Sequence, residues 1–151
     1  MYQRILVPTD GSDTAQRGVD EAIALAKTLG ARIRLVHVVN ERSLVSPEVT
    51  GAAFDRYAEQ LHEFGASVLK ATERHVRDAG VGVDAKLIET VTAPAAEYIL
   101  HEARDWPADL IVCGTHGRRG IRRIVLGSDA EYIVRQSPVP VLLVRARDGA
   151  G

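Results

Sequence analysis

The chain has 151 residues, enough for one domain with its own core, and its 19 basic residues nearly balance its 20 acidic ones. This balance argues against a nucleic-acid partner or an anionic membrane surface, and no run of about 18 apolar residues could span a bilayer. Cys113, the single cysteine, excludes an intramolecular disulfide and a multi-cysteine zinc site and favours a reducing compartment, so we expect a cytoplasmic protein.

The first predicted strand is the apolar run at residues 5–7, which a polar turn at residues 8–12 closes. A helix follows, because apolar residues recur at helical spacing until Gly30 supplies a stop. Asp13 and Gln16, three residues apart, resemble a capping pair at its start.

The second predicted strand, residues 33–39, is apolar on both faces towards its end, as expected of a strand covered by helices on both sides. Residues 40–53 show no clear hydrophobic periodicity and are expected to form a long loop of the kind that often borders a site. A long helix then extends from Tyr57 to Gly80. Residues 81–87 alternate between apolar and polar, which predicts a half-exposed strand at an edge of the sheet.

The second half of the chain continues the alternation of strand and helix. A helix is expected at residues 94–103 and a buried strand at residues 110–113. After the glycine-rich and arginine-rich segment 114–127, Ser128 opens a helix, and residues 139–144 form the last strand.

Strict alternation of this kind predicts a single Rossmann-like α/β domain, with a parallel sheet, right-handed crossovers and helices on both faces. The domain is expected to span residues 1–146, and residues 147–151 are expected to form a flexible tail.

The last strand bears on assembly. Pro138 and Pro140 cannot donate ladder hydrogen bonds, so this strand should lie at an edge, yet neither of its faces is polar. A helix of the same chain could cover it, but we favour a second copy of the protein, in a homodimer. The contacting residues would be Val139, Val141, Leu142, Leu143 and Val144.

Ligands of open parallel sheets bind beyond the carboxyl ends of the strands, where the strand order reverses. Here the first strand delivers Pro8, Thr9 and Asp10, whose carboxylate can accept hydrogen bonds from ribose hydroxyls. The fourth strand delivers a segment with glycines, which expose main-chain amides to phosphate oxygens, and the helix start at Ser128 adds more amides. The alternative is that these glycines only shape a surface loop.

Several residues of this segment have two interpretations. Arg118 and Arg119 could neutralise a phosphate chain or remain solvated, and a nucleic-acid contact is the least favoured role. His116 could act as an acid or base near neutral pH, although a backbone role is favoured. Cys113 is expected to belong to the core rather than to act as a reactive thiol.

The segment resembles the signature of nucleotide-binding members of the universal stress protein family, Gly-x-x-Gly-x9-Gly-Ser/Thr. Gly114, Gly117, Gly127 and Ser128 meet it at the correct spacing. Residues 5–12, 108–112 and 137–145 also look like blocks of that family. Neither a P-loop nor the dinucleotide-binding Gly-x-Gly-x-x-Gly motif is present.

This resemblance implies a five-stranded sheet in the order 3-2-1-4-5, dimerisation through the last strand and binding of ATP. It places Thr9 and Asp10 at the adenosine and Val38 near the adenine. The phosphates would lie at the glycines and serine of the signature.

One departure from the family pattern is Asp129, where members often have an apolar residue. Its charge would repel phosphate unless it points away or holds a divalent cation, so ATP is expected to bind with Mg²⁺.

No spacing among Asp10, His116 and Asp129 marks a catalytic set, so at most weak ATP hydrolysis is expected. The favoured function is a nucleotide-dependent regulatory module of the stress response, in which ATP orders residues 114–127 and alters the surface offered to a protein partner of unknown identity. The alternatives are a slow Mg²⁺-dependent ATPase or self-phosphorylating enzyme, and a dimeric scaffold without ligand.

Overall fold

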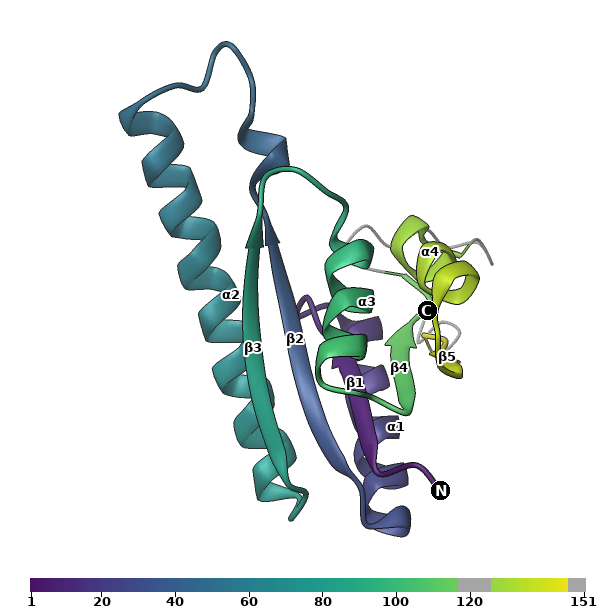
Figure 1. Cartoon of the computed structure of the whole chain (residues 1–151). Helices are drawn as coiled ribbons and strands as arrows, with labels where there is room; N and C mark the ends of the chain where they lie inside the picture. The colour runs from purple at the N-terminus through teal and green to yellow at the C-terminus, as the bar shows by residue number, and fades with distance from the viewer. Residues whose placement is uncertain (117–125, 147–151) are drawn as a thin grey trace.

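The structure is a computed structural model that describes residues 1–116 and 126–146. Strands and helices alternate along the described chain, as the sequence predicts (Figure 1). In chain order they are β1 (Arg4–Pro8), α1 (Asp13–Leu29), β2 (Arg32–Asn40), the 3-10 helix η1 (Glu41–Leu44), α2 (Ala52–Asp78), β3 (Val83–Thr90), α3 (Ala95–Asp105), β4 (Leu110–Gly114), α4 (Ser128–Gln136) and β5 (Val141–Val144).

The five strands form one parallel sheet in the order β3-β2-β1-β4-β5. The order implied by the family resemblance is therefore confirmed, and so are the predictions that the strands β3 and β5 lie at the edges. Strand β1 is central: Ile5 pairs with Ile33 of β2 on one side and with Leu110 of β4 on the other.

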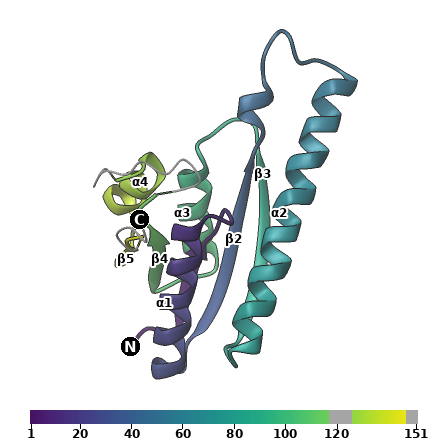
Figure 2. The same ribbon diagram turned by 180° about the vertical axis from the view of Figure 1, so that it is seen from behind.

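Helices cover both faces of the sheet (Figures 1 and 2). Alternate residues of β1 face one helix layer or the other. Ile5 and Val7 are buried with residues of α1 and α2 in one apolar cluster. Leu6 is buried with residues of α3 and α4 in a second cluster. The central strand is thus covered on both faces, which explains its unbroken apolar sequence.

The start of α1 differs from the prediction. Ser12, rather than Asp13, is the N-cap, and its hydroxyl accepts a hydrogen bond from the Ala15 amide at 3.2 Å. Asp13 is already helical, and the side chain of Gln16 donates to Asp20 instead of reaching back to the cap. The predicted stop at Gly30 is confirmed, since this residue has φ 67°.

Both edge strands begin two residues later than predicted, because local hydrogen bonds occupy the preceding backbone. The Ser137 hydroxyl accepts from the Val139 amide and donates to the Val139 carbonyl, so Val139 lies before β5. The Val81 amide donates to Val76 at the end of α2, and β3 begins only at Val83.

The expected loop at residues 40–53 is partly ordered. It contains η1, whose N-cap Asn40 accepts a hydrogen bond from the Arg42 amide, and α2 already begins at Ala52. Among the helices that the structure describes, none is both long and apolar enough to cross a membrane.

A buried carboxylate fastens α3 to the sheet. Glu102 is 2% exposed and accepts hydrogen bonds from Arg34 at 2.8 Å and from Lys86 at 2.5 Å. Arg34 also makes a bidentate pair with Asp84, and hydrogen bonding to that carboxylate raises the pKa of Arg34. The guanidinium carbon lies 4.8 Å from the ring centroid of Trp106, at the C-terminal end of α3.

Candidate functional site

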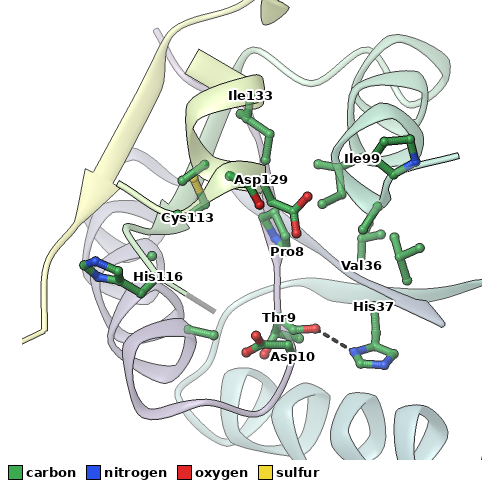
Figure 3. Close-up of a pocket in the computed structure, with 18 of the residues that line it drawn as sticks. Pro8, Thr9, Asp10, Val36, His37, Ile99, Cys113, His116, Asp129 and Ile133 are labelled. Atoms are coloured by element: carbon green, nitrogen blue, oxygen red, sulfur yellow. Dashed lines mark hydrogen bonds between the residues drawn. The ribbon is translucent and has the colours of Figure 1, made fainter. Parts of the chain in front are cut away.

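A cavity of about 810 Å³ lies beyond the carboxyl ends of β1, β2 and β4. The N-terminal parts of α3 and α4 supply the opposite wall (Figure 3). This is the place where the strand order reverses, because β1 is followed in the chain by β2 on one side and pairs with β4 on the other.

The turn after β1 is held by bonds to β2. The Thr9 amide donates to the Val36 carbonyl at 2.9 Å, and the Thr9 carbonyl accepts from His37 Nδ1 at 2.8 Å (Figure 3). The next residue, Asp10, lines the cavity, and one of its carboxylate oxygens accepts from the Ser12 amide at 2.9 Å. The turn therefore presents a carboxylate on a fixed backbone.

The chain that leaves β4 is fastened at Thr115. Its amide donates to the Val144 carbonyl at 3.0 Å, and its carbonyl accepts from the Gly127 amide at 2.8 Å. The two described ends of the glycine-rich segment thus meet at Thr115. His116 hydrogen-bonds through Nδ1 to the Thr115 hydroxyl at 3.0 Å, whereas its Nε2 is buried and has no hydrogen-bond partner within the described residues.

The first turn of α4 borders the cavity with Ser128, Asp129 and Ala130. Amides of a first helical turn have no acceptor within the helix, and the helix dipole adds a partial positive charge. The N-cap is Gly127, which has no side chain, so no side-chain cap competes with an anion for these amides. Asp129 opposes this field with a carboxylate at the same end (Figure 3).

An apolar wall lies between these two polar ends. It comprises Val36 and Val38 from β2, Ile99 from α3 and Ile133 from α4. A cavity with an apolar wall, a carboxylate at one strand end and helix amides at another matches a ligand that joins a flat ring, hydroxyl groups and an anion.

Cys113 belongs to the core, as predicted. Its side chain ends a buried strand and is 5% exposed, although it also touches the cavity. Burial raises the pKa of the Cys113 thiol to about 12, so the thiol is neutral at physiological pH.

The structure brings the described site residues of the sequence analysis around this one cavity. They are Pro8, Thr9, Asp10, Val38, Gly114, His116, Gly127, Ser128 and Asp129. Gly117, Arg118 and Arg119 lie outside the described residues.

Sequence reasoning missed three polar residues at the carboxyl end of β2 and in η1: His37, Asn40 and Arg42. It also missed Pro94 and Ala95 at the start of α3. The signal available was the position of β2 beside β1, since neighbouring parallel strands end at the same edge of a sheet.

Comparison with known proteins decides the family. The model of the universal stress protein family matches residues 1–145. The chain belongs to this family.

The match covers most of the length of its relatives. A universal stress protein of Methanocaldococcus jannaschii is 36% identical over 145 residues, which cover 96% of this chain and 83% of the relative. Universal stress protein YxiE of Bacillus subtilis is 31% identical, with 96% and 100% covered.

Solved structures of the family share the fold. A universal stress family protein from Burkholderia pseudomallei superposes with a TM-score of 0.79 and 31% identity, covering 96% of this chain and 97% of that one. Two more distant universal stress proteins, each 23% identical, were solved as complexes: one with cAMP (TM-score 0.68; 95% and 97% covered) and one from Archaeoglobus fulgidus with dAMP (TM-score 0.64; 95% and 98% covered).

The cavity of this universal stress protein is compatible with an adenine nucleotide and a cation. The described residues contain no group of three or more His, Cys, Asp or Glu side chains that could hold a metal alone. Mg²⁺ in nucleotide sites needs only one or two carboxylates, because phosphates and water complete its coordination. Asp10 and Asp129, which both line the cavity, are the carboxylates available for that role.

Proposed function

We propose that this universal stress protein binds ATP with Mg²⁺ in the cavity beyond β1, β2 and β4, and that it acts in the cytoplasm as a nucleotide-dependent regulatory module of the stress response. The observation that carries the proposal is the pairing, around one cavity, of the Asp10 carboxylate with the first turn of α4. The cAMP and dAMP complexes of two structural neighbours support the adenine nucleotide class.

Each part of the cavity suits one part of the ligand. Val36, Val38 and Ile99 offer an apolar surface to the adenine ring. Asp10 accepts hydrogen bonds from ribose hydroxyls. The first-turn amides around Ser128 donate to phosphate oxygens, with Gly114 and Gly117 of the signature. Asp129, which lines the cavity, would hold the Mg²⁺ ion, whose positive charge would offset the repulsion between this carboxylate and the phosphates.

Binding alone is sufficient for regulation. A nucleotide that contacts both the β1 turn and α4 stabilises one arrangement of these elements, by an amount set by its affinity. A protein partner that contacts the same end of the sheet would then distinguish the loaded from the empty state. Arg118 and Arg119 are proposed to add charge to the phosphate contact, and the segment 114–127 to be the part that responds to ATP.

The proposal also includes a homodimer through β5. This strand ends the sheet, so one of its edges has no partner strand within the described chain. Val141, Leu142 and Leu143 are each only partly buried, which leaves apolar side chains beside that edge. Pairing with a second copy would cover both the backbone edge and these side chains.

The test of the nucleotide site is isothermal titration with ATP and Mg²⁺ on the wild type and on Asp10→Asn. The substitution keeps the acceptor for the Ser12 amide but removes the charge. We expect affinity to fall by about fivefold, because hydrogen bonds to charged groups are stronger than neutral ones. Asp55→Asn, on an exposed turn of α2, is the matched control and should bind as the wild type does.

Absence of binding to the wild type would refute the nucleotide site outright. Turnover is measured in the same preparation under single-turnover conditions with Mg²⁺. Hydrolysis that Asp129→Asn abolishes would favour the rival function, a slow ATPase, over a binding module.

A further inference from the structure

The imidazole of His37 in β2 is buried and makes a hydrogen bond whose donor and acceptor can be assigned. The side chain is 7% exposed, and Nδ1 lies 2.8 Å from the Thr9 carbonyl oxygen. Because a carbonyl can only accept, Nδ1 carries the proton and donates, which fixes the tautomer of the neutral ring.

This bond extends the attachment of β1 to β2 beyond the end of the strand. Strand β1 ends at Pro8, and the Thr9 amide makes one further bond to the Val36 carbonyl. The His37 side chain then donates to the Thr9 carbonyl, so both backbone polar groups of Thr9 are bonded to consecutive residues of β2. The direction in which the chain enters Asp10 is set by these two bonds.

Helix α2 leaves room for this imidazole at a single glycine. A Cβ on Gly65 would lie 2.6 Å from His37 Cδ2 and 2.9 Å from His37 Nε2. Glycine weakens a helix interior, and Gly65 lies near the middle of a helix of 27 residues, so a packing reason is required. The neighbouring residue of α2, Phe64, also packs on His37: the two ring centroids lie 6.3 Å apart in an edge-to-face arrangement.

We infer that His37 is a positioning residue of the nucleotide site, an inference that rests on the proposed function. Its Nδ1–H holds the Thr9 carbonyl so that the Asp10 carboxylate faces the ribose. Gly65 is also needed for this arrangement, because its lack of a side chain lets α2 pack against the His37 ring without displacing it.

The test compares two substitutions of His37 with the wild type. His37→Asn retains a side-chain N–H near the position of Nδ1, whereas His37→Leu removes it at similar bulk. ATP affinity is measured by titration, and the urea midpoint of each empty protein is measured separately. We expect His37→Leu to weaken ATP binding by about tenfold, the loss of one well-placed hydrogen bond, and His37→Asn to restore binding to within about threefold of the wild type.

Gly65→Ala disturbs the same arrangement while His37 itself is retained. The added methyl group displaces the ring, so ATP binding should weaken as it does in His37→Leu. Gly82→Ala is the matched control, because a Cβ there meets only Arg32 at 3.6 Å, an ordinary contact. Gly65→Ala decides the question if His37→Leu fails to fold.

A ribose readout separates positioning from general stability. The wild type should bind ATP more tightly than 2′-deoxy-ATP or 3′-deoxy-ATP, because each analogue lacks a ribose hydroxyl that could donate a hydrogen bond to Asp10. In His37→Leu and Gly65→Ala this preference should vanish, since the carboxylate is no longer aimed. A merely structural role would lower the urea midpoint and leave the preference intact.

Four results overturn the inference. Full ribose preference in His37→Leu or Gly65→Ala would show that His37 does not aim Asp10, and so would unchanged ATP affinity in both variants. A wild type that binds ATP with no ribose preference would refute only the inference that Asp10 is aimed at the ribose, and not the proposed nucleotide site. A wild type that binds no nucleotide would refute the proposed function, and the inference with it.

Discussion

Thr14 of α1 and Gly114 of β4 approach so closely that a Cβ on Gly114 would lie 2.7 Å from Thr14 Cγ2 and 3.0 Å from the Thr14 carbonyl oxygen. One turn further along α1, a Cβ on Gly18 would lie 3.4 Å from the Gly114 amide nitrogen. Gly114 is therefore required for packing between helix and strand, whether or not a phosphate contacts it.

Gly114→Ala should consequently destabilise the empty protein. One obstacle is the backbone carbonyl of Thr14, which a rotamer change cannot move, so we expect a loss of about 1–3 kcal/mol in the free energy of unfolding. Urea denaturation measures this change. Gly82→Ala, where a Cβ meets only ordinary contacts, should lose less, and equal losses in both variants would contradict the packing role.

Asp129→Asn should change ATP affinity in opposite directions with and without Mg²⁺. Without the metal, removal of a carboxylate from the first turn of α4 should strengthen binding by about two- to fivefold. With saturating Mg²⁺ the same substitution should weaken binding, because a cation ligand is lost. Glu131→Gln is the control: this carboxylate lies in the same turn but does not line the cavity and is paired with Arg135 at 2.8 Å, so its removal should change both values less. An Asp129→Asn variant without any metal dependence would contradict the cation role.

Cys113 should make the protein less stable in alkali. Burial raises the pKa of its thiol from 9.0 to about 12, so above pH 9 the unfolded chain releases a proton that the folded chain retains. The resulting contribution is fully present below pH 9 and is lost as pH rises towards 12, by up to about 1.4 kcal/mol per pH unit. Unfolding free energies of the wild type and Cys113→Ala, measured at pH 8 and pH 10, test this. The wild type should lose more stability between the two pH values.

Glu102→Gln should destabilise the domain more than the loss of an exposed ion pair does. Arg34 and Lys86 lose the charge of a partner that is 2% exposed, although water still reaches both cations, so we expect about 1–3 kcal/mol. Glu73→Gln removes the exposed pair with Arg77 and should cost below about 0.5 kcal/mol. Thermal or urea unfolding measures both, and equal effects would show that the buried network is unimportant.

Leu143→Lys should convert the proposed dimer into monomers. A charge at the edge of β5 that has no partner strand among the described residues is costly to bury against a second copy. Light scattering coupled to size exclusion gives the mass of each variant. Val45→Lys, a 64% exposed position beside η1, is the control and should keep the wild-type mass. A monomeric wild type would refute the interface directly.

Much of the fold could be predicted because hydrophobic period and strand position are linked. The alternation at residues 81–87 indicated a half-exposed strand, and β3 indeed lies at an edge. The exact strand starts could not be predicted, because they depend on local competition such as the Ser137 hydroxyl bonding both backbone groups of Val139. The Ser12 cap was missed because Asp13 offered an equally good side chain one residue later.

The site was predicted in part, because only some of its residues stand at recognisable boundaries between strands and helices. Asp10 and Gly127 are marked by their place after a strand and before a helix. His37 carries no such mark, because an isolated histidine within an apolar strand looks like a core residue in the sequence. Its contact with Thr9 depends on the pairing register of β1 and β2 and on the closeness of α2 at Gly65, which only the folded chain reveals.

The packing of Arg34 on Trp106 has a practical consequence. Trp106 is the only tryptophan in the sequence, and it lies at one end of α3 while Pro94 and Ala95, at the other end, line the cavity. Its fluorescence therefore reports how α3 is seated against the sheet, without an added dye. A ligand that shifts α3 on binding would therefore change the wavelength or the intensity of the tryptophan emission.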